Sequence, residues 1–153
     1  MDSLERVLKS SAPISDPHLR VFLNVLVTGV WLQKSLNDLL KPYSITEPQF
    51  NVLRILRGQK GAAMNLYEIG DRMVHPTSNV SRIVDKLLEK GYLERKESEV
   101  NRRRVDISIT RAGLNLLETL DPAFDNAIKL LTSRCTQEEA LQLSDAIEAL
   151  RGV

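Results

Sequence analysis

The chain lacks several features that define whole classes of protein. Its single cysteine, Cys135, cannot form an internal disulfide, which excludes a disulfide-stapled fold and suits a reducing compartment such as the cytoplasm. The two histidines, His18 and His75, lie far apart in the sequence. A metal centre needs several ligands with supporting hydrogen bonds, and no spacing of residues here predicts one.

Long apolar runs and catalytic motifs are also missing. No apolar stretch approaches the roughly 20 residues that span a membrane. Residues 1–11 carry charges where a signal peptide has its apolar centre. The sequence has no glycine-rich phosphate loop, no nucleophile–base pair and no paired carboxylates. We therefore expect no membrane partner, no cofactor and no enzymatic activity.

Charge is nearly balanced over the whole chain, but not along it. With 153 residues, 42% of them apolar and 27% charged, the chain can form one globular domain with a real core. The net charge is only +1. Residues 72–111 contain ten Lys/Arg and six Asp/Glu, a net of +4, whereas residues 112–153 contain three and seven, a net of −4. This asymmetry fits a local surface that faces phosphates, or two ordinary solvated faces.

Most of the sequence has the periodicity of amphipathic helices. Asp16-Pro17 predicts a helix start, and apolar residues recur from there to Lys41, where Pro42 ends the pattern. The apolar stripe is so wide that this helix needs cover on more than one side, which a second chain would supply. Residues 1–15 before it are expected to be a loose arm.

Helix caps predict the other long helices. Thr46 and Thr136 each begin a capping box, in which the first and fourth residues exchange hydrogen bonds between side chain and backbone. Thr110 caps a further helix, in which Asp121-Pro122 predicts a kink or a break. A proline inside a helix costs about 3 kcal/mol, because it removes a hydrogen bond and clashes with the preceding turn.

The centre of the chain, Asn65 to Thr110, has a different pattern. It begins with a helix over Leu66–Met73, capped by Asn65, and continues through a turn into a second helix from about Thr77 to Lys90. Gly91 predicts a left-handed end for this second helix. One of its sides is apolar (Val80, Ile83, Val84, Leu87, Leu88), and the other carries Ser78, Asn79, Ser81, Arg82, Asp85 and Lys86. Short polar side chains and Arg on an exposed helix face can read the major groove of DNA.

Two strand-like runs follow this helix. Residues 92–96 form the first, and the alternation of Val105, Ile107 and Ile109 with polar residues forms the second, while Met64 predicts a short third strand. Residues 102–104, three consecutive arginines, lie at the tip between the two runs, where they suit a phosphate backbone or a narrow minor groove. A helix-turn-helix followed by a two-stranded ribbon is a winged helix.

Two segments of this region, Ser78 to Arg95 and Asn101 to Gly113, resemble the MarR family of bacterial winged-helix regulators. The family has Asp-x-Arg at the wing, and then an alternating strand that ends in Leu-Thr-x-x-Gly. Here the matching residues are Asn101-Arg102-Arg103 and Ile109-Thr110-Arg111-Ala112-Gly113. The chain departs from the pattern at Asn101, so the ion pair that an Asp would form to steady the wing is lost.

The resemblance and the patterns together predict a mainly α (α+β) fold. A single MarR-type domain over residues 1–153 would have a winged helix-turn-helix core at about 46–110 and long dimerisation helices at about 16–41 and 111–152. The resemblance implies a homodimer that binds double-stranded DNA at a pseudo-palindromic operator and represses transcription, although an activator would need the same residues. Two alternatives remain open: a winged helix that serves as a protein-interaction module, and a DNA-binding regulator without an effector.

The candidate site residues fall into two groups. Those expected to contact DNA are Thr77, Ser78, Asn79, Ser81, Arg82, Lys86, Arg102, Arg103 and Arg104. By the family motif, Arg103 matches the wing arginine that reaches the minor groove. The resemblance also implies a cavity for a small aromatic effector, which Trp31, Tyr43 and Phe50 would line. The alternative for these three is that they are plain core residues.

Overall fold

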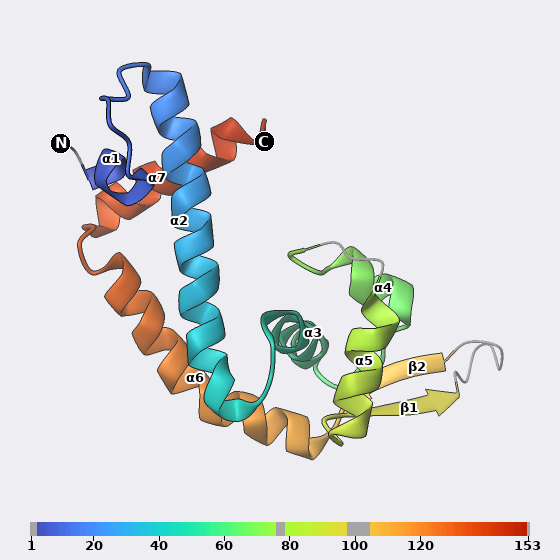
Figure 1. The fold of residues 1–153 in the computed structure, drawn as a ribbon. Coiled ribbons are helices and arrows are strands. Elements are labelled where there is room, and N and C mark those ends of the chain that lie inside the picture. Colours follow the sequence, from blue (N-terminus) through green and yellow to red (C-terminus); the bar gives the residue numbers. More distant parts are fainter. Residues whose placement is uncertain (1–2, 76–78, 98–104, 153) are drawn as a thin grey trace. The chain divides into compact units, whose positions relative to one another are not determined.

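The computed structural model describes residues 3–75, 79–97 and 105–152 (Figure 1). The chain divides into two compact units, Met1–Phe50 and Asn51–Val153. Most of the described residues are helical, and their strands form one two-stranded sheet, as the predicted fold class requires. None of the described helices is long and apolar enough to cross a membrane.

The first unit is built on one long helix. It contains α1 (Ser3–Leu8), α2 (Pro17–Leu40), the short 3-10 helix η1 (Lys41–Tyr43) and the first turn of α3 (Glu47–Gly58). Asp16 caps α2, because its Oδ1 accepts a hydrogen bond from the His18 N–H at 2.8 Å. The predicted start of this helix is therefore confirmed, with Pro17 at its first position.

The N-terminal arm is not loose, and that expectation is wrong for its described part. Glu5 is only 2% exposed. Its Oε1 accepts hydrogen bonds from the Ile14 N–H at 3.0 Å and from Arg20 Nη1 at 2.7 Å, which ties the arm to the first turn of α2. The Ile14 N–H and the residue's own N–H, with Arg20 as a smaller cause, hold the pKa of Glu5 below its ordinary value.

The second unit contains the winged core. The rest of α3 is followed by α4 (Leu66–Asp71), α5 (Val80–Glu89), β1 (Leu93–Glu97) and β2 (Val105–Ile109). The strands are antiparallel, with Arg95 opposite Ile107. The predicted third strand is a single bridge, in which Met64 and Ile107 exchange backbone hydrogen bonds of 2.9 and 2.8 Å. The buried apolar side chains of this core include Val52, Leu53, Leu56, Met64, Ile69, Val84, Leu87, Leu93, Ile107, Leu117 and Leu120.

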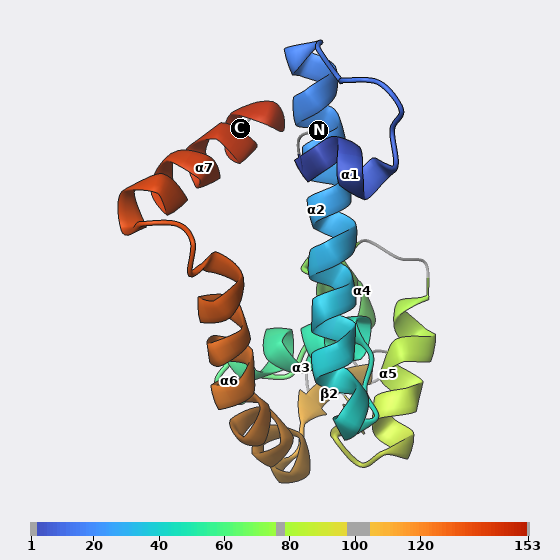
Figure 2. The same cartoon turned by 60° about the vertical axis from the view of Figure 1, so that its left-hand side comes forward.

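Two helices complete the second unit. Thr110 caps α6 (Arg111–Thr132) as predicted, by accepting the Gly113 N–H at 3.2 Å. Pro122 lies inside α6, which continues through it as one helix, and the ribbon changes direction part-way along (Figure 1, Figure 2). The predicted capping box at Thr136 is also confirmed, and it opens α7 (Gln137–Leu150).

Candidate nucleic-acid interface

The helix α5 begins later than the sequence predicts. The expected start at about Thr77 is wrong, because the first helical residue is Val80. Asn79 has φ −99° and ψ 21°, outside helical geometry, and its carbonyl oxygen accepts the Ile83 N–H at 3.1 Å. Asn79 is therefore the N-cap residue. Thr77 and Ser78 lie outside the described residues.

The two faces of α5 differ as predicted. Val84 and Leu87 are fully buried in the winged core. The opposite face exposes four of the predicted contact residues, which are Asn79, Ser81, Arg82 and Lys86. Because spacings of three and four residues share a helix face, Asn79, Arg82 and Lys86 line one side of α5. This side presents an amide and two cations to solvent.

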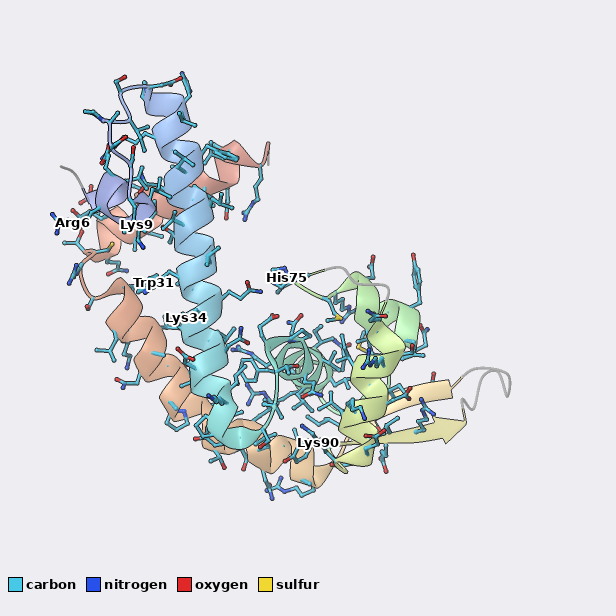
Figure 3. All side chains as sticks on the ribbon, viewed as in Figure 1. Arg6, Lys9, Trp31, Lys34, His75 and Lys90 are labelled. Carbon is cyan, nitrogen blue, oxygen red and sulfur yellow. The ribbon has the colours of Figure 1, made fainter. Side chains whose placement is uncertain are left out.

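The C-terminal end of α5 is fixed by a left-handed glycine. Gly91 has φ +72° and donates to the Leu88 carbonyl at 2.9 Å, and Tyr92 donates to the Leu87 carbonyl at 3.0 Å. These two hydrogen bonds form a Schellman motif, which ends the helix and turns the chain into β1. Lys90 lies at this end of α5 (Figure 3).

Some charged residues of this surface form ion pairs, and Arg82 does not among the described residues. Asp85 of α5 pairs with Arg95 of β1, and both are about half exposed. Lys86 pairs with Glu89 at 2.8 Å. Within the described ranges, Arg82 forms no ion pair. The sequence indicated only that Asp85 lies on the polar face, and no local pattern showed that it anchors the ribbon to the helix.

Side-chain hydrogen bonds fix both ends of α4. Asn65 and Glu68 form the predicted capping box of α4, with both hydrogen bonds at 3.0 Å. At the other end of α4, Asn51 of α3 accepts the Val74 N–H through its Oδ1 at 3.0 Å. His75, next along the chain, lies in the turn that leads toward α5 (Figure 3). The role of Asn51 was not evident from the sequence, because its partner is distant in the chain.

The base of the wing is described, and its tip is not. Ser108 of β2 donates a hydrogen bond to Glu94 Oε1 of β1 at 3.1 Å, which adds a side-chain link to the backbone ladder. Arg102, Arg103 and Arg104 lie outside the described residues. Among the described residues, no group of three or more His, Cys, Asp or Glu is placed to hold a metal ion.

The three residues of the predicted effector pocket differ in exposure. Trp31, which lies on α2 (Figure 3), is 49% exposed. Phe50 is 3% exposed. Leu40 lies nine positions after Trp31 on α2, a distance of about 14 Å along the axis, and Tyr43 lies beyond Leu40. The structure therefore does not bring Trp31 and Tyr43 together within one chain, and the pocket stays a prediction.

Comparison with known proteins bears directly on this surface. A family model described as "MarR family" matches residues 45–105, which include the whole helix-turn-helix. The chain is 30% identical over 144 residues to the HTH-type transcriptional regulator PapX of Escherichia coli, covering 90% of this chain and 87% of PapX. It is 29% identical over 151 residues to the transcriptional repressor MprA of Escherichia coli, covering 96% of this chain and 86% of MprA.

Solved structures give the same fold. A mutant MarR of Escherichia coli, solved in complex with operator DNA, matches with a TM-score of 0.78 at 21% identity over 91% of this chain and 99% of that chain. The organohalide-sensing regulator RdhR, solved with 2,4-dichlorophenol bound, matches with a TM-score of 0.80 at 17% identity over 94% of this chain and 86% of that chain. The winged helix, the polar face of α5 and the similarity to PapX lead to one conclusion: the chain belongs to the MarR family and is a DNA-binding transcriptional regulator.

Proposed function

We propose that the protein is a homodimeric repressor that binds a pseudo-palindromic operator. The observation that carries this proposal is the exposed polar face of α5, on which Arg82 has no ion pair among the described residues. Two such helices, one from each subunit, would enter successive major grooves about one helical turn apart. The two wings would contact the flanking DNA.

The exposed apolar side chains support a dimer. On α2 these are Leu19, Val21, Phe22, Val25, Leu26, Val30, Trp31 and Leu32, and on α7 they are Leu141, Leu143 and Leu150. A monomeric protein rarely exposes so many large apolar side chains on two of its helices. An open hollow of about 300 Å³ lies between Thr132 at the end of α6 and the apolar residues Leu143 and Ile147 of α7. We propose that α2, α6 and α7 are dimerisation helices.

The proposed DNA contacts come from the polar face of α5, the residues just before it and the wing. We assign base or phosphate contacts to Ser78, Asn79, Ser81 and Arg82, backbone contacts to Thr77 and Lys86, the minor groove to Arg103, and phosphates to Arg102 and Arg104. Such a regulator works where bacterial DNA lies, in the cytoplasm. The name of MprA as a repressor and the dichlorophenol bound to RdhR support repression that a small aromatic compound relieves.

Selection of genomic fragments by the purified protein tests this function. At near-physiological salt we expect enrichment of a short inverted repeat, bound as a dimer with a steep dependence on salt. The variants Arg102→Ala and Arg104→Ala should flatten that dependence, because each lost phosphate contact lowers the slope by about one unit. If no fragment is enriched and binding ignores sequence, the winged helix serves protein contacts instead.

A further inference from the structure

Two arginines of α3 contact α6 on both sides of its proline. Arg57 forms a two-pronged ion pair with Asp121, with Nη1 to Oδ2 at 2.6 Å and Nη2 to Oδ1 at 3.0 Å. One turn earlier on α3, the Arg54 guanidinium lies over the ring of Phe124, 4.8 Å from its centre. The Asp121 carboxylate raises the pKa of Arg57 above its ordinary value, with the charge of Glu118 as a smaller contribution.

The hydrogen-bond ladder of α6 is interrupted between these two contacts. Pro122 has no N–H to donate to the Glu118 carbonyl, so one hydrogen bond of the helical ladder is missing there. The ribbon changes direction in this part of the helix (Figure 1, Figure 2). A helix that lacks one bond of its ladder bends more readily, unless neighbouring elements hold it. Here α3 contacts Asp121, directly before the proline, and Phe124, two positions after it.

Small changes at this point would be amplified along α6. From Pro122 to Thr132 the helix extends about 15 Å, so a rotation of about 10° at the proline would shift its far end by about 3 Å. One base-pair step of DNA rises by about 3.4 Å. A small change in the direction of α6 would therefore change the preferred spacing of the two bound half-sites by about one base pair.

We propose that Arg57 and Asp121, supported by the contact of Arg54 with Phe124, are positioning residues that set the operator spacing of this regulator. By fixing the direction in which α6 leaves the winged core, they fix the separation of the two α5 helices in the dimer. This inference rests on the proposed homodimer. A pair that only stabilises the fold would lower affinity equally for all operators, whereas a positioning pair changes which spacing is preferred.

The test is a set of operators whose half-sites are moved apart or together by one and two base pairs. Asp121→Asn removes the carboxylate charge that pairs with Arg57. The matched control is Asp125→Asn, one turn further along α6, because Asp125 is exposed and has no ion pair among the described residues. We expect Asp121→Asn to weaken binding at the parental spacing by about fivefold to tenfold. The variant should then bind the shifted operators nearly as tightly as it binds the operator with the parental spacing. Asp125→Asn should keep the wild-type profile.

Two further variants separate positioning from folding. The exchange Arg57→Glu with Asp121→Arg re-forms the pair with reversed charges, and we expect it to restore much of the spacing preference that either single variant loses. Pro122→Ala returns the missing hydrogen bond and stiffens α6, so it should narrow the spacing profile of Asp121→Asn. Thermal unfolding followed by circular dichroism establishes that each variant is folded.

The outcomes distinguish the two proposals. If the wild type shows a sharp spacing preference that Asp121→Asn leaves unchanged, the positioning role is refuted while the dimeric operator model stands. A uniform loss of affinity at every spacing refutes it equally. If the wild type has no spacing preference, the dimeric operator model fails, and this inference fails with it.

Discussion

Replacing Arg82 by alanine should weaken DNA binding without affecting the fold. The side chain is exposed on α5 and forms no ion pair among the described residues. Its loss leaves no cavity and no buried partner, so the free energy of unfolding should change by no more than about 0.5 kcal/mol. Urea unfolding followed by circular dichroism measures this change.

The effect on binding can be estimated from the charge that is lost. A dimer loses two arginines, and each phosphate contact contributes about 0.9 to the slope of log K against log salt concentration, so the slope should fall by about 1.8. If Arg82 instead pairs with a guanine edge, each subunit loses about 1–3 kcal/mol, or about 2–6 kcal/mol for the dimer. Loss of a phosphate contact weakens binding to all DNA sequences alike. Loss of a base contact instead relaxes specificity at two symmetric positions of the operator.

Fluorescence anisotropy at a series of salt concentrations, on the selected operator and on a scrambled duplex, measures both effects. Arg134→Ala is the matched control, because Arg134 is an exposed arginine beyond the end of α6 and its removal makes the same change in charge. Identical slopes and affinities for Arg82→Ala and Arg134→Ala would refute the reasoning, because Arg82 would then lie away from the bound DNA.

Three further substitutions test the winged core and the caps. Gly113→Ala should destabilise the protein by about 1–3 kcal/mol in urea unfolding, since a Cβ there would stand 2.5 Å from a backbone oxygen, whereas Gly58→Ala meets no atom within 4 Å and should be tolerated. Asn51→Ala should cost more free energy of operator binding than of unfolding, because the Val74 N–H before α5 loses its hydrogen-bond acceptor. Asn51→Asp keeps an acceptor oxygen and should restore binding. The Thr136 N–H and hydroxyl lower the pKa of Glu139 below its ordinary 4.5. The stability from this cap is thus present above pH 4.5 and lost as pH falls through the lowered value, and acid unfolding of Glu139→Gln should lack that loss.

Local signals predicted most of the fold, because they act within a few residues of chain. Asp16, Asn65, Thr110 and Thr136 each accept a hydrogen bond at the helix start that the sequence predicts. Gly91 adopts the left-handed conformation that its position predicts. The start of α5 was placed too early, because the first apolar position of its pattern is Val80 and the backbone of Asn79 before it is not helical.

The contacts that orient these elements could not be predicted in this way. Arg57 and Asp121 are 64 residues apart, and Asn51 and Val74 are 23 apart. Each of these side chains has many suitable partners in the sequence, and only the folded core decides which partner comes within reach. The buried Glu5 shows the same limit, because an isolated acidic residue in a polar arm gives no sign of the Arg20 contact.

The polar face of α5 shows how pairing changes a prediction made from spacing alone. In the sequence, Arg82 and Lys86 are two cations one turn apart on the polar face of the helix. In the structure Lys86 already pairs with Glu89, so it must give up that contact before it can bind a phosphate. An exposed pair of this kind contributes no more than about 1 kcal/mol, so the exchange remains accessible but lowers the net gain. Arg82 gives up no ion pair among the described residues, and for this reason Arg82→Ala should reduce operator affinity more than Lys86→Ala.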